Sequence, residues 1–108
     1  MGKKESLVRQ LRAFAREIAP DYLLQKMILF GSQATGKPHK DSDVDLIIVS
    51  TKFSGVPRVE RSPDLYLRWE LDYPVDFLCY TPEEFKRKKK QIGIVQKAVE
   101  EGVEVYAS

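Results

Sequence analysis

Two aspartates, Asp43 and Asp45, lie in the stretch DVDLIIVS (43–50), which otherwise has the composition of a buried β-strand. Side chains alternate across a strand, so both carboxylates are expected on one face. They repel each other there unless solvent or a cation lies between them. Strand-borne oxygen ligands suit Mg²⁺, which binds through carboxylates together with substrate phosphates. For either aspartate alone, a solvated turn residue is the competing interpretation.

A third carboxylate, Asp76, lies near the start of another apolar segment, PVDFLCY (74–80). Neighbouring strands are about 4.8 Å apart, so Asp76 would join Asp43 and Asp45 if the two segments pair. Such a triad could hold two metal ions about 3.5–4 Å apart, the arrangement used for in-line phosphoryl or nucleotidyl transfer. The sequence therefore predicts Asp43, Asp45 and Asp76 as metal ligands and catalytic residues.

Gly31 and Ser32 directly follow the apolar segment KMILF (26–30). Glycine lets the backbone approach a ligand closely. Backbone N–H groups in a following helical turn, together with the Ser32 hydroxyl, would bind phosphate oxygens. The segment GSQATGKP is not a Walker A loop, because its spacing differs and no Ser or Thr follows Lys37. Gly31 and Ser32 are predicted to bind the nucleotide; taken alone, the pair has an ordinary turn as its competing interpretation.

Gly31-Ser32, ten intervening residues and then Asp43-Val44-Asp45 together resemble the DNA polymerase β-like nucleotidyltransferase superfamily. Within it, the chain is most similar to the minimal nucleotidyltransferases of prokaryotes, the MntA type. The resemblance extends from Leu29 to Ala107 and includes VDFLCY and the tail EEGVEVYA. It implies an α+β fold with α/β two-layer character, in which a mixed β-sheet is flanked by helices.

The resemblance also implies a role for each site residue. Asp43 and Asp45 would bind two Mg²⁺ ions, and Asp76 would bind one of them and act as general base. Gly31 and Ser32 would hold the β- and γ-phosphates of a nucleoside triphosphate. The reaction would transfer a nucleoside monophosphate to a hydroxyl group and release pyrophosphate.

Minimal nucleotidyltransferases are typically paired with HEPN-domain proteins, and this pairing gives the leading functional hypothesis. The chain would be the antitoxin of a toxin–antitoxin pair, transferring AMP from ATP to a tyrosine hydroxyl of the HEPN toxin. One alternative is a catalytically weak or inactive binding module that neutralises its partner by contact. Another is nucleotide transfer to a small-molecule hydroxyl. Thr35, where relatives often carry arginine, removes a positive charge that Lys37 or Lys40 could replace.

The chain has 108 residues, which suits a single domain over residues 1–108. Its net charge of +2 argues against a strongly basic nucleic-acid binder. The basic run Arg87–Lys90 indicates a solvated helix face or contact with an acidic partner or RNA, without sequence specificity. No apolar run reaches the roughly 18 residues that span a membrane, and no signal peptide is recognisable. These features, with the lone Cys79 expected as a buried thiol, favour a cytoplasmic protein, as a monomer or an oligomer.

Hydrophobic periodicity predicts the elements that position these residues. Leu7, Leu11, Phe14, Ala15 and Ile18 indicate a helix capped by Ser6 and ending before Pro20. Strands are expected at 26–30, 43–50, 74–80 and 103–107, with a loop at 31–42. Further helices are expected from Ser62-Pro63 to about Leu71, from a Thr81-Pro82-Glu84 capping box, and at 94–101.

A few other side chains are open to more than one interpretation. Arg58 and Arg61 are candidates for triphosphate contact. Trp69 could stack on a base, but its spacing favours a place in the core. His39, the only histidine, is expected at the surface.

Overall fold

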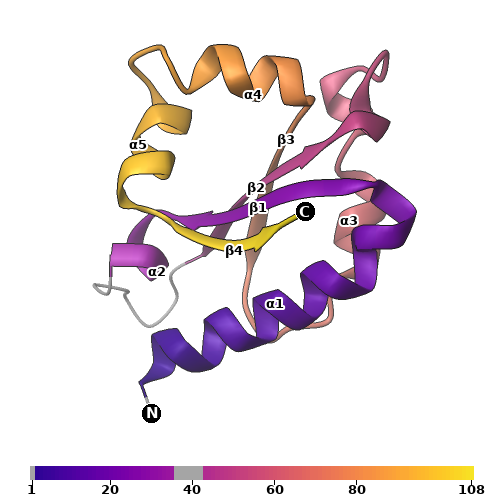
Figure 1. Cartoon of the computed structure of the whole chain (residues 1–108). Helices are drawn as coiled ribbons and strands as arrows, with labels where there is room; N and C mark the ends of the chain where they lie inside the picture. Colours follow the sequence, from indigo (N-terminus) through magenta and orange to yellow (C-terminus); the bar gives the residue numbers. More distant parts are fainter. Residues whose placement is uncertain (1, 36–42) are drawn as a thin grey trace.

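Helices and strands alternate along most of the chain in the computed structural model, which describes residues 2–35 and 43–108 (Figure 1). The α-helices are α1 (Lys3–Tyr22), α2 (Ser32–Thr35), α3 (Pro63–Arg68), α4 (Pro82–Lys88) and α5 (Ile94–Glu101). The strands are β1 (Leu24–Phe30), β2 (Val44–Ser50), β3 (Val75–Tyr80) and β4 (Val103–Ala107). Two 3₁₀ turns, η1 (Thr51–Phe53) and η2 (Arg58–Glu60), connect β2 to α3.

The four strands form one mixed sheet in the order β3-β2-β1-β4. β1 pairs antiparallel with both β2 and β4, whereas β2 and β3 are parallel. The parallel pair aligns Val44 with Val75, so β2 and β3 begin at the same edge of the sheet. The antiparallel pair places Phe30, the last residue of β1, opposite Asp45. One edge of the sheet therefore collects the starts of β2 and β3 and the end of β1.

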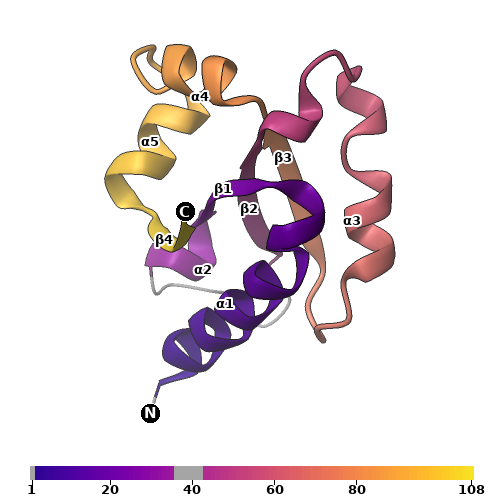
Figure 2. The ribbon, with the colours of Figure 1, turned by 45° about the vertical axis from the view of Figure 1, so that its right-hand side comes forward.

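Helices cover both faces of the sheet. On one face, α1 and α3 contribute to a core with Leu11, Ile18, Leu46, Leu65 and Phe77. On the other, α4 and α5 pack through Phe85, Val95 and Ala98 against Ile28, Ile47 and Val49. Figure 2 shows α4 and α5 on one side of the strands and α3 on the other. The predicted α+β class with a mixed sheet flanked by helices is confirmed. The expected two-layer arrangement was wrong, because helices cover both faces of the sheet and make three layers.

The first helix is longer than predicted at both ends. It begins at Lys3 with Gly2 as its N-cap, so the expectation that Ser6 caps it was wrong. It also continues through Pro20 to Tyr22, and the expected end before Pro20 was wrong. Proline removes one backbone hydrogen bond, but tertiary contacts of Tyr22 hold the final turn. The buried Tyr22 donates its hydroxyl hydrogen to Asp64, and its carbonyl accepts from the Ser50 hydroxyl.

The remaining predicted elements are present with small differences in their ends. All four strands are confirmed, although β1 begins at Leu24, two residues earlier than expected. α3 ends at Arg68 rather than near Leu71. The predicted capping box at α4 is confirmed: Thr81 Oγ1 accepts from the Glu84 N–H at 3.1 Å, and Glu84 Oε1 accepts from the Thr81 N–H at 2.9 Å.

Two further predictions concern the thiol of Cys79 and the absence of a membrane-spanning helix. Cys79 is a buried free thiol, as expected, and burial raises its pKa to about 12, so it stays protonated and unreactive. Over the described ranges, no helix is long and apolar enough to cross a membrane.

Arg61 ties together three segments at the end of the sheet opposite Asp45. Its side chain is buried, and the two terminal nitrogens of its guanidinium donate to the Glu84 carboxylate, at 2.7 and 3.2 Å. It also donates to the carbonyl oxygens of Cys79 at 3.1 Å and Val56 at 2.8 Å. The interpretation of Arg61 as a triphosphate ligand is therefore wrong, because its donors already hold β3 to the helix that follows it.

The Arg61–Glu84 pair makes stability depend on pH in the acid range. The hydrogen bond from Arg61 lowers the pKa of Glu84 from 4.5 to about 2. A carboxylate with a lowered folded-state pKa stabilises the fold above its unfolded pKa and loses that contribution as pH falls through the folded value. We expect the difference in unfolding free energy between the wild type and Glu84→Gln to shrink between pH 4.5 and pH 2. Chemical denaturation at several pH values measures it; a constant difference would contradict the lowered pKa.

Candidate active site

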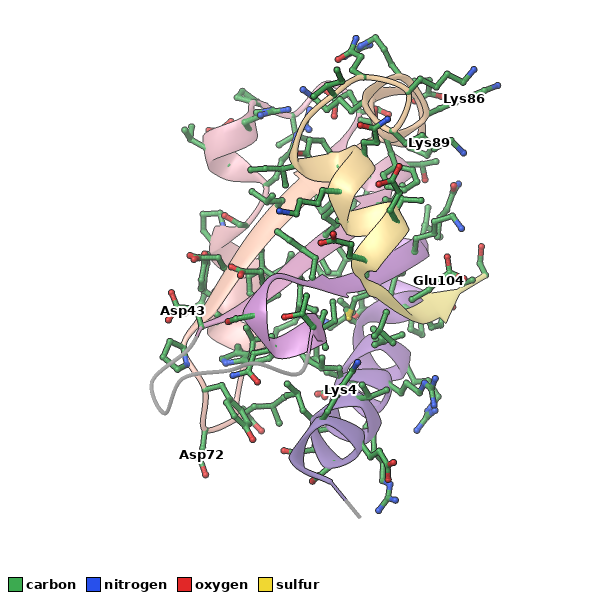
Figure 3. The ribbon with its side chains drawn as sticks, turned by 90° about the vertical axis from the view of Figure 1, so that its left-hand side faces the viewer. Lys4, Asp43, Asp72, Lys86, Lys89 and Glu104 are labelled. Carbon is green, nitrogen blue, oxygen red and sulfur yellow. The ribbon has the colours of Figure 1, made fainter. Side chains whose placement is uncertain are left out.

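The predicted aspartates lie at the sheet edge where β2 and β3 begin. The strand register places Asp45 directly beside Asp76 across the parallel pair. Asp43 immediately precedes β2 and is exposed, as is Asp76, whereas Asp45 is half-buried. Figure 3 shows Asp43 near the start of β2, beside α2. The structure thus brings the three residues to one edge because two separate strands begin there in register.

Gly31 lies against the Asp45 carboxylate. Gly31 directly follows β1 and has a φ of +77°, a conformation that disfavours side chains. A Cβ placed on Gly31 would lie 2.5 Å from Asp45 Oδ2. The Gly31 carbonyl accepts hydrogen bonds from the backbone N–H groups of Ala34 at 3.0 Å and Thr35 at 3.2 Å, which closes the short α2. Glycine is required here because the turn and the carboxylate occupy adjoining space.

The three carboxylates repel one another. Burial, and then the negative charges of Asp76 and Asp43, raise the pKa of Asp45 above its ordinary value. Within residues 2–35 and 43–108, no cationic side chain forms an ion pair with Asp43, Asp45 or Asp76. The site therefore holds negative charge that this part of the protein does not neutralise, and a bound cation would relieve it.

The donor set fits magnesium. All three side chains offer only carboxylate oxygens, the ligands that Mg²⁺ prefers. Across the described ranges, no three acidic, His or Cys side chains lie close enough together to surround one ion, so the three aspartates share a sheet edge without forming a complete metal cluster. Magnesium is commonly bound by one or two carboxylates, with substrate phosphates and water completing the shell.

A cavity of about 370 Å³ opens beside Gly31. One wall comes from the end of β1 and from α2 and contains Phe30, Gly31, Ser32 and Thr35. The opposite wall is one face of α5, formed by Ile94, Lys97, Ala98 and Glu101. Its volume is in the range of small-molecule sites. That α5 forms a wall of this cavity was not predicted from the sequence. The i, i+3, i+4 and i+7 spacing of these four α5 residues, which places them on one helix face, was the feature that could have indicated it.

Several other candidates lie elsewhere. Arg58 stacks over the Tyr80 ring, 5.2 Å from its centroid, towards the end of β3. Trp69 is partly buried and packs against the core, as expected: its ring lies edge-on to Phe14, and its indole N–H donates to the Tyr73 carbonyl at 2.8 Å. Lys37, His39 and Lys40 lie outside the described residues.

The basic run lies on and just after α4, away from the aspartates. In Figure 3, Lys86 and Lys89 lie at the end of the molecule opposite Asp43. The side chains of Lys86, Arg87 and Lys90 line a shallow groove with Glu83 and Gln91. This placement separates the run from the candidate active site.

We expect Gly31→Ala to impair activity far more than stability. The positive φ costs about 1 kcal/mol for alanine, and the new Cβ would displace the Asp45 carboxylate. Gly55→Ala is a matched control, since Gly55 has a φ of +76° but no atom within 4 Å of an added Cβ. Thermal unfolding should show similar losses for both variants, whereas nucleotidyl transfer should fall only in Gly31→Ala. Equal transfer by the two variants would contradict the close contact with Asp45.

The family model for the nucleotidyltransferase domain matches residues 8–106, so this chain belongs to that family. The activity of the chain is therefore nucleotidyl transfer. The chain is 28% identical over 96 residues to a probable protein adenylyltransferase MntA of Haemophilus influenzae, covering 87% of this chain and 82% of that protein.

Two crystal structures share the fold. A putative nucleotidyltransferase from Sulfolobus solfataricus superposes with a TM-score of 0.69 at 18% identity, over 99% of this chain and 90% of that one. A toxin–antitoxin complex with AMP-PNP superposes with a TM-score of 0.56 at 22% identity, over 90% and 73% of the two chains. These structural similarities confirm the predicted fold, whereas the family is shown by the match to the nucleotidyltransferase domain model.

Proposed function

We propose that the chain is a magnesium-dependent adenylyltransferase that acts as the antitoxin of a HEPN-type toxin–antitoxin pair. It would transfer AMP from ATP to a tyrosine hydroxyl of the toxin. The observation that carries this proposal is the half-buried Asp45, which lies beside Asp76 and against Gly31 and has no cationic partner in the described part of the chain. The adenylyltransferase MntA relative and the toxin–antitoxin complex with AMP-PNP support the choice of nucleotide and of partner.

The proposed roles follow from position. Asp43, Asp45 and Asp76 would hold two Mg²⁺ ions, which supply charge neutralisation and alignment of the reacting oxygens. Gly31 and Ser32 would bind the β- and γ-phosphates. Gly31 permits close backbone approach, and the Ser32 hydroxyl offers a hydrogen bond. Catalysis would depend on positioning and electrostatics and would need no covalent intermediate on the protein.

The chemical step is an in-line displacement at the α-phosphorus of ATP. The tyrosine oxygen forms the new bond to phosphorus while the bond to the bridging oxygen of the β-phosphate breaks. Pyrophosphate leaves with that electron pair, and Asp76 takes the proton of the attacking hydroxyl as general base. Asp76 is exposed, so the hydroxyl of a second protein can reach it.

The test is to co-express the chain with the products of its neighbouring genes, where the proposal expects a HEPN-domain protein. The chain and that protein are then purified, incubated with ATP and Mg²⁺, and weighed. We expect the partner to gain the mass of AMP and its toxicity to be lost, with the modification on a tyrosine. Neutralisation without a mass gain would contradict enzymatic transfer and would instead support masking by contact. Omitting Mg²⁺ should abolish the mass gain.

A further inference from the structure

The α5 wall of the cavity places a lysine opposite the predicted phosphate-binding turn. Lys97 lines the same cavity as Gly31 and Ser32. Ile94, Lys97, Ala98 and Glu101 follow the spacing i, i+3, i+4 and i+7, so they share one face of α5. The buried Val95 and Ala98 hold that helix against the sheet, which fixes the direction of the face.

The Lys97 ammonium has no acidic partner among the described residues. Lys97 is exposed, and within the described residues it forms no ion pair and no hydrogen bond. By contrast, Lys26 is paired with Glu104 at 2.9 Å, and Arg68 with Asp21 at 2.8 Å. Lys97 is also the one cationic side chain among the described residues that line this cavity. Its ammonium is thus available to a ligand.

A cation at this position would offset the negative charge of a bound triphosphate. A triphosphate bound at Gly31 and Ser32 adds negative charge beside three aspartates that already repel one another. Ammonium–phosphate contacts are charge-assisted and stronger than neutral hydrogen bonds. Phe30, Ile94 and Ala98 supply the apolar part of the cavity lining, and Glu101 adds one carboxylate on the α5 wall. An apolar lining with a few placed polar groups is typical of small-molecule sites.

We propose that Lys97 is a positioning residue that binds the phosphate groups of the nucleoside triphosphate across the cavity from Gly31 and Ser32. This inference rests on the proposed function, since it assumes that the cavity receives the nucleotide. It assigns the α5 face to substrate binding and makes Lys97 the cation of that wall. The contact would be to phosphate rather than to the base, so affinity should depend on the number of phosphates.

Calorimetric binding of ATP and of AMP, both with Mg²⁺, tests the proposal. We expect Lys97→Ala to weaken ATP binding about tenfold, as the loss of one charge-assisted hydrogen bond predicts, and to change AMP binding much less. Lys97→Arg should keep most of the ATP affinity. Lys86→Ala is the matched control, because Lys86 is an exposed lysine at the far end of the molecule (Figure 3). Circular dichroism should show the wild-type fold for all of them.

The outcomes separate this inference from the proposed function. If the wild type binds ATP and Lys97→Ala binds it equally well, the assignment of Lys97 is wrong while the proposed function stands. An equal loss of ATP and AMP binding would also overturn it, because the contact would then not be to the extra phosphates. If the wild type itself does not bind ATP, both the proposed function and this inference fail.

Discussion

Replacing Asp45 with asparagine should abolish nucleotidyl transfer while leaving the fold intact or more stable. Asparagine keeps the shape of the side chain but removes the charge that would bind the metal ions. Losing about 4 kcal/mol of transition-state stabilisation corresponds to about a thousandfold in rate. We therefore expect transfer to fall at least that far, measured as AMP incorporated into the partner at saturating ATP and Mg²⁺.

The expected stability change has the opposite sign. Burial and the charges of Asp76 and Asp43 raise the pKa of Asp45. A carboxylate with a raised folded-state pKa stabilises the fold at low pH and loses that contribution as pH rises through the folded value. At neutral pH the charged Asp45 thus costs stability, and Asp45→Asn should melt at the same temperature as the wild type or higher.

Asp72→Asn is the matched control for both readouts. Asp72 is an exposed aspartate between α3 and β3, and it lies below Asp43 on the same side of the molecule in Figure 3. It should keep wild-type transfer. A variant Asp45→Asn that still transferred AMP, or that lost activity only by unfolding, would contradict the proposed role of this carboxylate.

Replacing Arg61 with alanine should cause the largest loss of stability. The change removes a buried guanidinium, which leaves Glu84 without its cationic partner and the Cys79 and Val56 carbonyls without the donor that Arg61 supplies. Removing one partner of a buried pair typically costs 3–5 kcal/mol, and Glu84 keeps some solvent contact, so we expect about 3 kcal/mol. That corresponds to a fall in melting temperature of more than about 10 °C for a domain of this size.

Arg68→Ala provides the comparison. Arg68 also binds two acidic residues, Asp21 at 2.8 Å and Asp64 at 3.2 Å, but all three side chains are partly exposed. Exposed pairs contribute less than about 1 kcal/mol. Equal losses for Arg61→Ala and Arg68→Ala would contradict the structural role of Arg61. A raised KM for ATP in folded Arg61→Ala would restore the discarded interpretation of a triphosphate ligand.

The strand-borne part of the candidate site could be predicted from the sequence because it depends on local signals. Asp43 and Asp45 interrupt an apolar run, Asp76 lies near the start of another, and Gly31 ends a third. Because side chains alternate across a strand, the aspartates are expected on one face of the sheet. Because a tight turn favours glycine, Gly31 is expected at the turn after the strand. The register that aligns Asp45 with Asp76 required only that the two strands be parallel neighbours.

The helical wall and the ion pairs could not be predicted in the same way, because they depend on how distant elements pack. Lys97 faces Gly31 only because α5 packs over the end of β1. Arg61 pairs with Glu84, 23 positions further along the chain, and a separation of that length does not indicate from the sequence that the two residues meet. Pro20 indicated a helix end, but contacts of Tyr22 with distant residues outweighed that local preference.

The fate of each phosphate of ATP tests the central claim most directly. The purified chain and the HEPN-domain protein proposed as its partner would be incubated with Mg²⁺ and ATP labelled at either the α- or the γ-phosphorus. We predict that the α-label becomes covalently bound to the partner and that the γ-label is released as pyrophosphate, with neither result in Asp45→Asn. Transfer of the γ-label to the partner, or equal α-labelling by Asp45→Asn, would contradict nucleotidyl transfer at this site.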